Sequence, residues 1–183
     1  MIEHKSITRL FDVTIPLYQF SDNDVWPMFH SFCFDFSVWE MFGALFYGGR
    51  LIIVNKDVVK DGILFTELLI NQKVTILNQT PSAFYVLQNY INEKISFSSL
   101  KYVIFGGEAL SPSKIHYTKE LSESYQLFNM YGITEISVHA TYQKIKLSHI
   151  YNLNIPIGRP IANTQIYILG PDQGLVPVGV TGE

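Results

Sequence analysis

The sequence predicts an α/β fold, in which a layered and largely parallel sheet carries flanking helices and ends in a small β region. Short apolar segments alternate with segments of helical periodicity over the first two thirds of the chain. After residue 137, strand patterns continue without long helices between them. The 183 residues, 48% of them hydrophobic, can bury a core of one domain's size, and no internal repeat or linker divides them.

Strands and helices are expected to alternate along the parallel part of the sheet. Trp39, Phe42 and Phe46 lie three to four residues apart on one helix face, and Gly48-Gly49 ends that helix. Pro81 opens a later helix, and Ser111 caps the last one. The patterns together predict strands at 25–31, 51–54, 74–77, 100–105 and 126–129, and helices at 36–47, 63–72, 82–92 and 112–123.

The C-terminal β region is predicted to hold strands at 137–145 and 164–169, with turns at 170–172 and 173–174. Parallel α/β sheets bind ligands beyond the carboxyl ends of their strands, where the connecting loops converge. Candidate polar or small residues follow four of the predicted strands. We therefore expect one cleft to be faced by Asp35, Asn78, Gly106 and Asn129.

Composition excludes several classes of partner. The formal net charge is -3 and Lys and Arg form no run, so neither nucleic acid nor a membrane is an expected partner. Cys33 is the only cysteine and the five histidines are scattered, so we expect neither an intrachain disulfide nor a zinc site. The N-terminus lacks the apolar core of a signal peptide, and the longest aliphatic run, 51–54, is too short to cross a bilayer. A cytoplasmic location is expected.

The segment 129–135 combines an amide, an aromatic ring, a hydroxyl and a carboxylate directly after an apolar strand. Tyr131 offers a face to a purine, and Asn129 can pair with an adenine edge. Thr134 can donate to a phosphate oxygen, while Glu135 is a hard oxygen ligand suited to Mg²⁺. By itself the segment favours a polar loop in which Asn129 and Gly132 only shape the turn.

Further motifs occur in a fixed order around this segment. They span residues 30–40, 78–82 and 104–110 upstream, and residues 157–160 and 178–183 downstream. In this order they resemble the adenylation domain of a nonribosomal peptide synthetase, in the superfamily that also holds acyl-CoA ligases and luciferases. The resemblance runs the whole length of the chain. It implies ATP and Mg²⁺ as cofactors, and phosphopantetheine on a carrier domain as the acceptor in a complete enzyme.

The resemblance also implies that residues 1–183 form part of the larger subdomain of an adenylate-forming enzyme. The family's phosphate loop normally precedes a segment like Met1 to Lys5, and its ribose-binding aspartate and catalytic lysine normally follow a segment like Thr181 to Glu183. Expected partners are the remainder of that domain, a carrier domain and a condensation domain. We expect little or no turnover by this chain alone, because positioning and charge neutralisation carry such chemistry.

Carried over from the family, Asp35 pairs with the α-ammonium of an amino-acid substrate. An N-cap for the helix that follows is a compatible role. The resemblance assigns the side-chain pocket to Phe36, Trp39, Asn78, Ile104, Gly106, Met130, Val138 and His139. This set resembles the one associated with threonine. Taken one by one, the aromatic and aliphatic members are more typical of an ordinary core, and His139 of a strand histidine with its hydrogen bonds satisfied. Only the whole set at the family's positions favours threonine.

The residue types in this set agree with threonine. Trp39, Ile104, Met130 and Val138 offer an apolar wall for a methyl group, while Asn78 and His139 can bond a hydroxyl. Valine would leave those two groups unpaired, and such a site can reject the analogue by up to roughly 10⁴ to 10⁵. Serine would lose only methyl contacts worth about 1–3 kcal/mol, so serine and allo-threonine stay as alternatives.

For ATP, the family places adenine against backbone like Gly106, Gly107 and Glu108. Asn129, Tyr131 and Gly132 border the base, while Thr134 and Glu135 meet the phosphates and Mg²⁺. Ile133 stands where the family usually has proline. His30 matches a family histidine near the reacting carboxylate, and an ordinary buried strand histidine is the alternative.

Three hypotheses follow for the whole chain. The first is a piece of a functional amino-acid-adenylating enzyme, either a fragment or one partner of a split domain. The second is a non-catalytic remnant that folds and binds threonine or nucleotide weakly. The third is a ligase for another carboxylic acid, which the carboxylate of Asp35 argues against, because it selects an amine.

Overall fold

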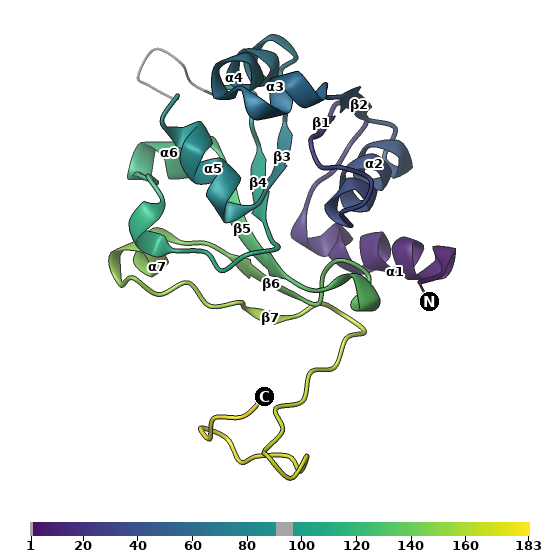
Figure 1. Ribbon diagram of the computed structural model, residues 1–183, viewed down its shortest axis with the longest axis vertical. Coiled ribbons are helices and arrows are strands. Elements are labelled where there is room, and N and C mark those ends of the chain that lie inside the picture. Colours follow the sequence, from purple (N-terminus) through teal and green to yellow (C-terminus); the bar gives the residue numbers. More distant parts are fainter. Residues whose placement is uncertain (1, 91–96) are drawn as a thin grey trace.

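The computed structural model describes residues 2–90 and 97–183, which form a five-stranded sheet beside a two-stranded one (Figure 1). In the larger sheet β3, β4 and β5 are parallel, and β6 and β7 continue it antiparallel. In the smaller sheet β1 and β2 are parallel. The strands are β1 (Val25–Met28), β2 (Arg50–Ile53), β3 (Ile76–Gln79), β4 (Tyr102–Phe105), β5 (Gln126–Tyr131), β6 (Thr141–Lys144) and β7 (Arg159–Pro160). The predicted α/β class with a largely parallel sheet is confirmed.

Helices cover both sheets and begin at residues that satisfy their first amides. Asp61 accepts bonds from the backbone amides of Ile63 and Leu64, and Thr80 accepts one from Ala83. The α-helices are α1 (His4–Thr14), α2 (Phe36–Phe46), α3 (Lys56–Lys60), α4 (Gly62–Asn71), α5 (Pro81–Gln88), α6 (Lys119–Ser124) and α7 (Leu147–Tyr151). Short 3₁₀ turns are η1 (Ile15–Leu17), η2 (Pro112–Lys114) and η3 (Thr134–Ile136). In the described parts of the chain, no helix has the length and apolar character needed to cross a membrane.

The helix predicted at 112–123 is wrong, because the structure divides it into η2 and α6. Between them the chain is extended, and the buried side chains of Ile115 and Tyr117 anchor it to the core. The Tyr117 hydroxyl donates to the carbonyl of Tyr125 at 2.8 Å. Thr118 then caps a new helix by accepting a bond from Leu121. Tertiary burial therefore overrides the helical pattern of this segment.

The β region also differs from expectation. The strand predicted at 137–145 begins only at Thr141, because Ser137 and Val138 have left-handed φ angles of 70° and 68° that no strand can hold. Residues 164–169 form no strand, and Leu169 makes one isolated bridge to Leu175. This last segment runs away from the body of the molecule (yellow in Figure 1). Helix α5 ends at Gln88, and residues 91–92 of the predicted helix lie outside the described residues.

Alternate residues of the central strands supply two cores, one on each face of the larger sheet. Leu77, Val103 and Leu127 point into the core beneath α4 and α5, with Phe65 and Phe84. The opposite face joins α1, α2 and β1 in a second core rich in aromatic rings. Its members include Ile76, Ile104, Phe128, Met130, Trp26, Trp39, Phe36, Phe11, Tyr18 and Val138. The second core matters for function, because most of the predicted side-chain pocket belongs to it.

A buried carboxylate ties the two sheets together. Asp24 precedes β1, is completely buried, and accepts bonds from the Thr75 hydroxyl at 2.8 Å and the Lys101 ammonium at 2.7 Å. Thr75 in turn accepts a bond from the backbone amide of Val25. This network fixes the starts of β1, β3 and β4 relative to one another, and so sets where their carboxyl ends meet.

Candidate active site

Two adjoining cavities open near the carboxyl ends of β4 and β5. The first has a volume of about 250 Å³ and is lined by Phe34, Asp35, Phe36, Gly107, Met130, Gly132, Ile133, Thr134, Glu135, Val138 and His139. The second has a volume of about 410 Å³ and is lined by Gly107, Glu108, Ala109, Leu110, Asn129, Met130, Tyr131, Gly132, Ile133, Ile155 and Ile157. Gly107, Met130, Gly132 and Ile133 border both, so the two cavities are neighbours.

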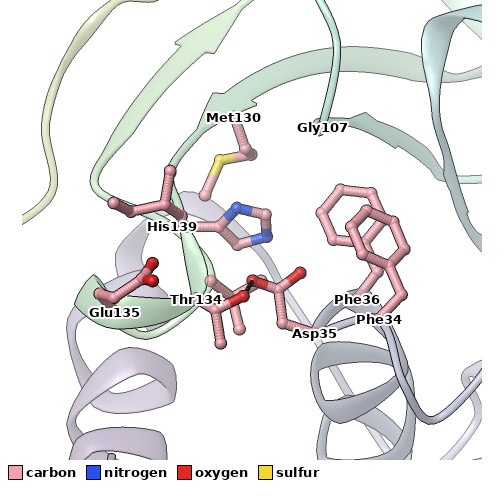
Figure 2. A pocket seen from close by; sticks show the side chains of 11 residues that line it. Phe34, Asp35, Phe36, Gly107, Met130, Thr134, Glu135 and His139 are labelled. Atoms are coloured by element: carbon pink, nitrogen blue, oxygen red, sulfur yellow. Dashed lines mark hydrogen bonds between the residues drawn. The ribbon is translucent and has the colours of Figure 1, made fainter.

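The charged groups of the first cavity come from two distant parts of the chain. Asp35 lies at the start of α2 and Glu135 in η3. The Thr134 hydroxyl donates to Oδ2 of Asp35 at 2.8 Å, as the dashed line in Figure 2 shows. Asp35 occupies the N-cap position of α2, but its side chain accepts no capping bond there, so the capping role is wrong. Its carboxylate faces the cavity.

His139 forms the inner wall of the first cavity. Its imidazole packs edge-on against Phe36 and Trp39, with ring centroids 5.5 and 5.0 Å away, and is 1% exposed. Figure 2 shows His139 between Met130 and Asp35. Burial lowers the pKa of His139 to about 3, so the ring is neutral near pH 7. Neither ring nitrogen has a hydrogen-bond partner within the described residues. A neutral imidazole can donate to or accept from a polar ligand group.

Four predicted pocket residues lie behind this lining and border neither cavity. The Trp39 indole donates to Oδ1 of Asn78 at 3.0 Å, which orients the amide, and Nδ2 of Asn78 has no partner in the described chain. Ile104 is fully buried next to them in the second core. At Gly106, a Cβ atom would lie 2.4 Å from Cζ of Phe36, so only glycine leaves room for that ring. The remaining predicted residues, Asp35, Phe36, Met130, Val138 and His139, line the cavity.

The second cavity is lined by most of the residues predicted to hold a nucleotide, whereas Thr134 lines the first cavity and Gly106 lines neither. Tyr131 is 48% exposed at its rim and offers a ring face. Nδ2 of Asn129 donates to the carbonyl of Pro156 at 3.1 Å, which fixes the amide at the cavity wall. Gly107 has a φ of 79°, which lets the backbone turn past the cavity. Glu108 accepts bonds from the amide and hydroxyl of Ser82, at the start of α5, so its side chain serves a helix end.

His30 borders neither cavity. Its ring packs against Phe34 and Phe36, which line the first cavity, with centroids 5.3 and 5.1 Å away. Nδ1 of His30 lies 2.8 Å from Oε1 of Glu40, and the His30 amide donates to Oε2 at 3.2 Å. Glu40 is fully buried, and burial raises its pKa although the bonds from His30 act against that rise.

Sequence reasoning missed several of these contributors. Glu40 looks like an ordinary member of an amphipathic helix, although it is the only charged residue in the apolar sequence of α2, which is a usable signal. Ile155 and Ile157 line the second cavity from a segment that no periodic pattern marks. Phe34 and Ile133 line the first through loop positions, where side-chain direction follows no simple rule.

Comparison with known proteins agrees with this architecture. A family model described as "AMP-binding enzyme" matches residues 1–183. A plipastatin synthase of Bacillus subtilis (strain 168) is 42% identical over 183 residues, and a dimodular nonribosomal peptide synthase of the same organism is 45% identical over 189. Both matches cover 100% of this chain but only 7% and 8% of the relatives, so the chain spans a small part of their length.

A solved structure shares the fold closely. It is a holo four-domain nonribosomal peptide synthetase bound to AMP and glycine, with a TM-score of 0.85 and 30% sequence identity. The match covers 99% of this chain and 13% of that one. The chain belongs to the AMP-binding enzyme family, and within it to the adenylation domains of nonribosomal peptide synthetases.

Proposed function

We propose that this chain supplies the amino-acid pocket and part of the ATP site of an amino-acid-adenylating ligase that serves nonribosomal peptide synthesis. The reaction joins an amino-acid carboxylate to the α-phosphate of MgATP, giving aminoacyl-AMP and pyrophosphate. The observation that carries the proposal is the pair of adjoining cavities. One holds a carboxylate and a buried imidazole, the other an amide and an exposed aromatic ring, and they share a wall.

The chemistry of the first cavity favours a small amino acid with a hydroxyl, and we propose L-threonine. Asp35 would pair with the α-ammonium. Met130, Val138 and Phe36 offer apolar surface to the methyl group. The ring nitrogens of His139, which lines the cavity, are buried and have no partner in the described chain, so a threonine hydroxyl can satisfy one of them, whereas valine leaves both unmet. Nδ2 of Asn78 is also without a partner there, but it lies behind the cavity lining.

The second cavity suits an adenine base and its attached groups. Tyr131 supplies a stacking face, and Asn129 presents an amide whose orientation the Pro156 carbonyl fixes. The backbone of Gly107 and Glu108 forms the opposite side. The size of about 410 Å³ is within the range of small-molecule cavities.

Thr134 and Glu135 lie in the first cavity, close to where the reacting groups would meet. Mg²⁺ is commonly bound through one or two carboxylates plus substrate phosphates, so the single carboxylate of Glu135 fits that need. The metal, when bound, would neutralise charge on the phosphates. The Thr134 hydroxyl has one proton to donate, and in this structure it donates it to Asp35. An ammonium on Asp35 would replace that bond and leave the hydroxyl for a phosphate oxygen.

We further propose that residues 1–183 act together with the remainder of the adenylation domain, in the cytoplasm and beside carrier and condensation domains. The phosphopantetheine thiol of the carrier would then accept the acyl group. On this proposal the phosphate loop and catalytic lysine lie outside the 183 residues, and the chain alone turns over little.

The test is ATP–pyrophosphate exchange across the common amino acids. It compares the 183-residue chain with the same segment joined to a family phosphate loop and C-terminal region, below called the completed protein. We expect threonine-dependent exchange in the completed protein only. Asp35→Asn should lower kcat/KM for threonine by about 100-fold, since a charge-assisted bond contributes about 1.5–3 kcal/mol.

The alternatives give other results. Exchange with an acid that has no α-amine would support a ligase for another carboxylic acid. A folded completed protein that exchanges with no substrate would support the non-catalytic remnant. Exchange that Asp35→Asn leaves intact would refute the role given to that carboxylate.

A further inference from the structure

Tyr18 is a buried tyrosine whose hydroxyl bonds to a residue of the candidate site. It follows the short turn η1 and is 3% exposed. Its hydroxyl donates to Sδ of Met130, 112 positions away in the sequence, at 3.3 Å, and this is its one hydrogen-bond partner in the described part of the chain. Burial raises the pKa of Tyr18 well above its usual range, so the hydroxyl keeps its proton and acts as a donor. Because a thioether is a weak acceptor, the bond is better suited to orienting Met130 than to stabilising the fold.

The ring of Tyr18 is held by other aromatic rings. Phe20 stacks on it with the centroids 4.8 Å apart, while Phe128 and Tyr102 meet it edge-on at 4.8 and 5.4 Å. The Tyr102 hydroxyl accepts a bond from the backbone amide of Gln19 at 3.3 Å, which ties the segment after Tyr18 to β4. A ring packed on several sides in a dense core has little freedom to move, so its hydroxyl is a fixed point.

Met130, by contrast, is flexible by nature and lies where flexibility matters. It lines both cavities and is 1% exposed. In Figure 2 its sulfur lies on the same side of the first cavity as His139. A methionine side chain has three rotatable bonds and adapts to its surroundings. Beside an open cavity it could swing away from a larger ligand, so a methionine wall selects ligands by size only if another group holds it.

We propose that Tyr18 is a positioning residue for substrate size, whose hydroxyl holds the thioether of Met130 so that the wall of the first cavity stays fitted to threonine. This role rests on the proposed function, in which Met130 offers apolar surface to the substrate methyl group. It adds to that function a residue that borders neither cavity. Tyr18 therefore touches no substrate and acts through Met130.

Two substrates that differ by one methylene group test the wall. β-Hydroxynorvaline is threonine with its methyl group extended to an ethyl group, and the hydroxyl and the α-ammonium are unchanged. A well-fitted pocket discriminates against one extra methylene by roughly 10- to 200-fold. In the completed protein, Tyr18→Phe should lower the ratio of kcat/KM for threonine to kcat/KM for β-hydroxynorvaline by about fivefold or more, because a released Met130 makes room for the extra carbon. The ratio for threonine over valine depends on the hydroxyl and should change less than about twofold.

Two further variants separate this role from a merely structural one. A general loss of folded enzyme lowers every kcat/KM equally and leaves both ratios unchanged. Tyr117→Phe is the matched control, because it also removes a buried tyrosine hydroxyl that donates a bond, in the core beneath α4 and α5. It should leave both ratios as they are. Met130→Leu removes the acceptor, so adding Tyr18→Phe to it should change the methylene ratio less than about twofold. A Tyr18→Phe protein that keeps the methylene ratio, or an equal effect of Tyr18→Phe in the Met130→Leu background, would overturn the proposal.

A measurement without turnover keeps this test separate from the proposed function. The chain has four methionines, so the ¹³C-methyl signal of Met130 can be followed in the 183-residue chain and assigned with Met130→Leu. Methyl relaxation reports side-chain motion on the picosecond to nanosecond timescale. We expect an ordered Met130 methyl group in the unmodified chain, and a lower order parameter in Tyr18→Phe but not in Tyr117→Phe. A methyl group that is already mobile in the unmodified chain, or equally ordered in Tyr18→Phe, would refute the role of Tyr18. Failure of exchange with every amino acid, together with a mobile methyl group in Tyr18→Phe, would instead count against the proposed function alone.

Discussion

Acidification should destabilise the protein through His139. Burial holds the pKa of His139 at about 3 in the folded state, against about 6.5 when unfolded. Below pH 6.5, His139 binds a proton in the unfolded chain but not in the folded one. The free energy of unfolding therefore decreases as the pH falls from 6.5 toward 3. Each pH unit in that window costs about 1.4 kcal/mol, so lowering the pH from 7 to 5 should cost about 2 kcal/mol.

The assay is urea unfolding at pH 5, 6 and 7, followed by the fluorescence of Trp26 and Trp39, which are both fully buried. Glu40 acts in the opposite direction, because its raised pKa makes the folded state gain stability as the pH falls toward 4.5. The contribution of His139 is therefore read as a difference from a His139→Leu chain, which cannot ionise at that position.

The unmodified chain should lose about 2 kcal/mol more than His139→Leu between pH 7 and 5. His116→Leu, at an exposed site, controls for the removal of a histidine as such. If His139→Leu lost as much stability as the unmodified chain, the imidazole would already be protonated or solvated when folded. The argument for a neutral polar group facing threonine would then fail.

Two further substitutions test the supports of the site. Lys101→Met should lower the free energy of unfolding in urea titrations by about 2 kcal/mol, because it leaves the buried carboxylate of Asp24 without its cation. The loss is smaller than for a fully buried pair, since the Lys101 side chain is 42% exposed. Lys119→Met, at an exposed position of α6, is the control, and an equal free energy of unfolding in the two variants would contradict the role of Asp24. Gly106→Ala should push the Phe36 ring into the first cavity and raise KM for threonine about tenfold in the completed protein, since its Cβ would lie 2.4 Å from that ring. Adding Phe36→Leu should relieve the clash, and an unchanged KM in the single variant would refute it.

The sequence predicted those parts of the fold that depend on local patterns of apolar residues. The alternation of apolar strands with helical segments indicates the α/β class, and the largely parallel sheet follows from it. Helix α2 matched because its apolar spacing and the glycines after it both act locally. The pattern failed at 112–123, where burial of Ile115 and Tyr117 favours extended backbone. It failed again at 137–138, where two left-handed residues shorten the strand.

The sequence by itself indicated candidate groups for the site and the order in which they occur, but not which of them line the cavities. Asp35, Asn78, Asn129 and Thr134 were identifiable because strand ends and turn residues leave a local signal. Tertiary structure alone decided which of them meet: Thr134 bonds Asp35 across 99 residues of chain, Trp39 orients Asn78, and Glu40 holds His30. Contacts of this kind depend on how the helices and sheets pack against one another. Local periodicity cannot predict them, because it describes only residues that are close together in the sequence.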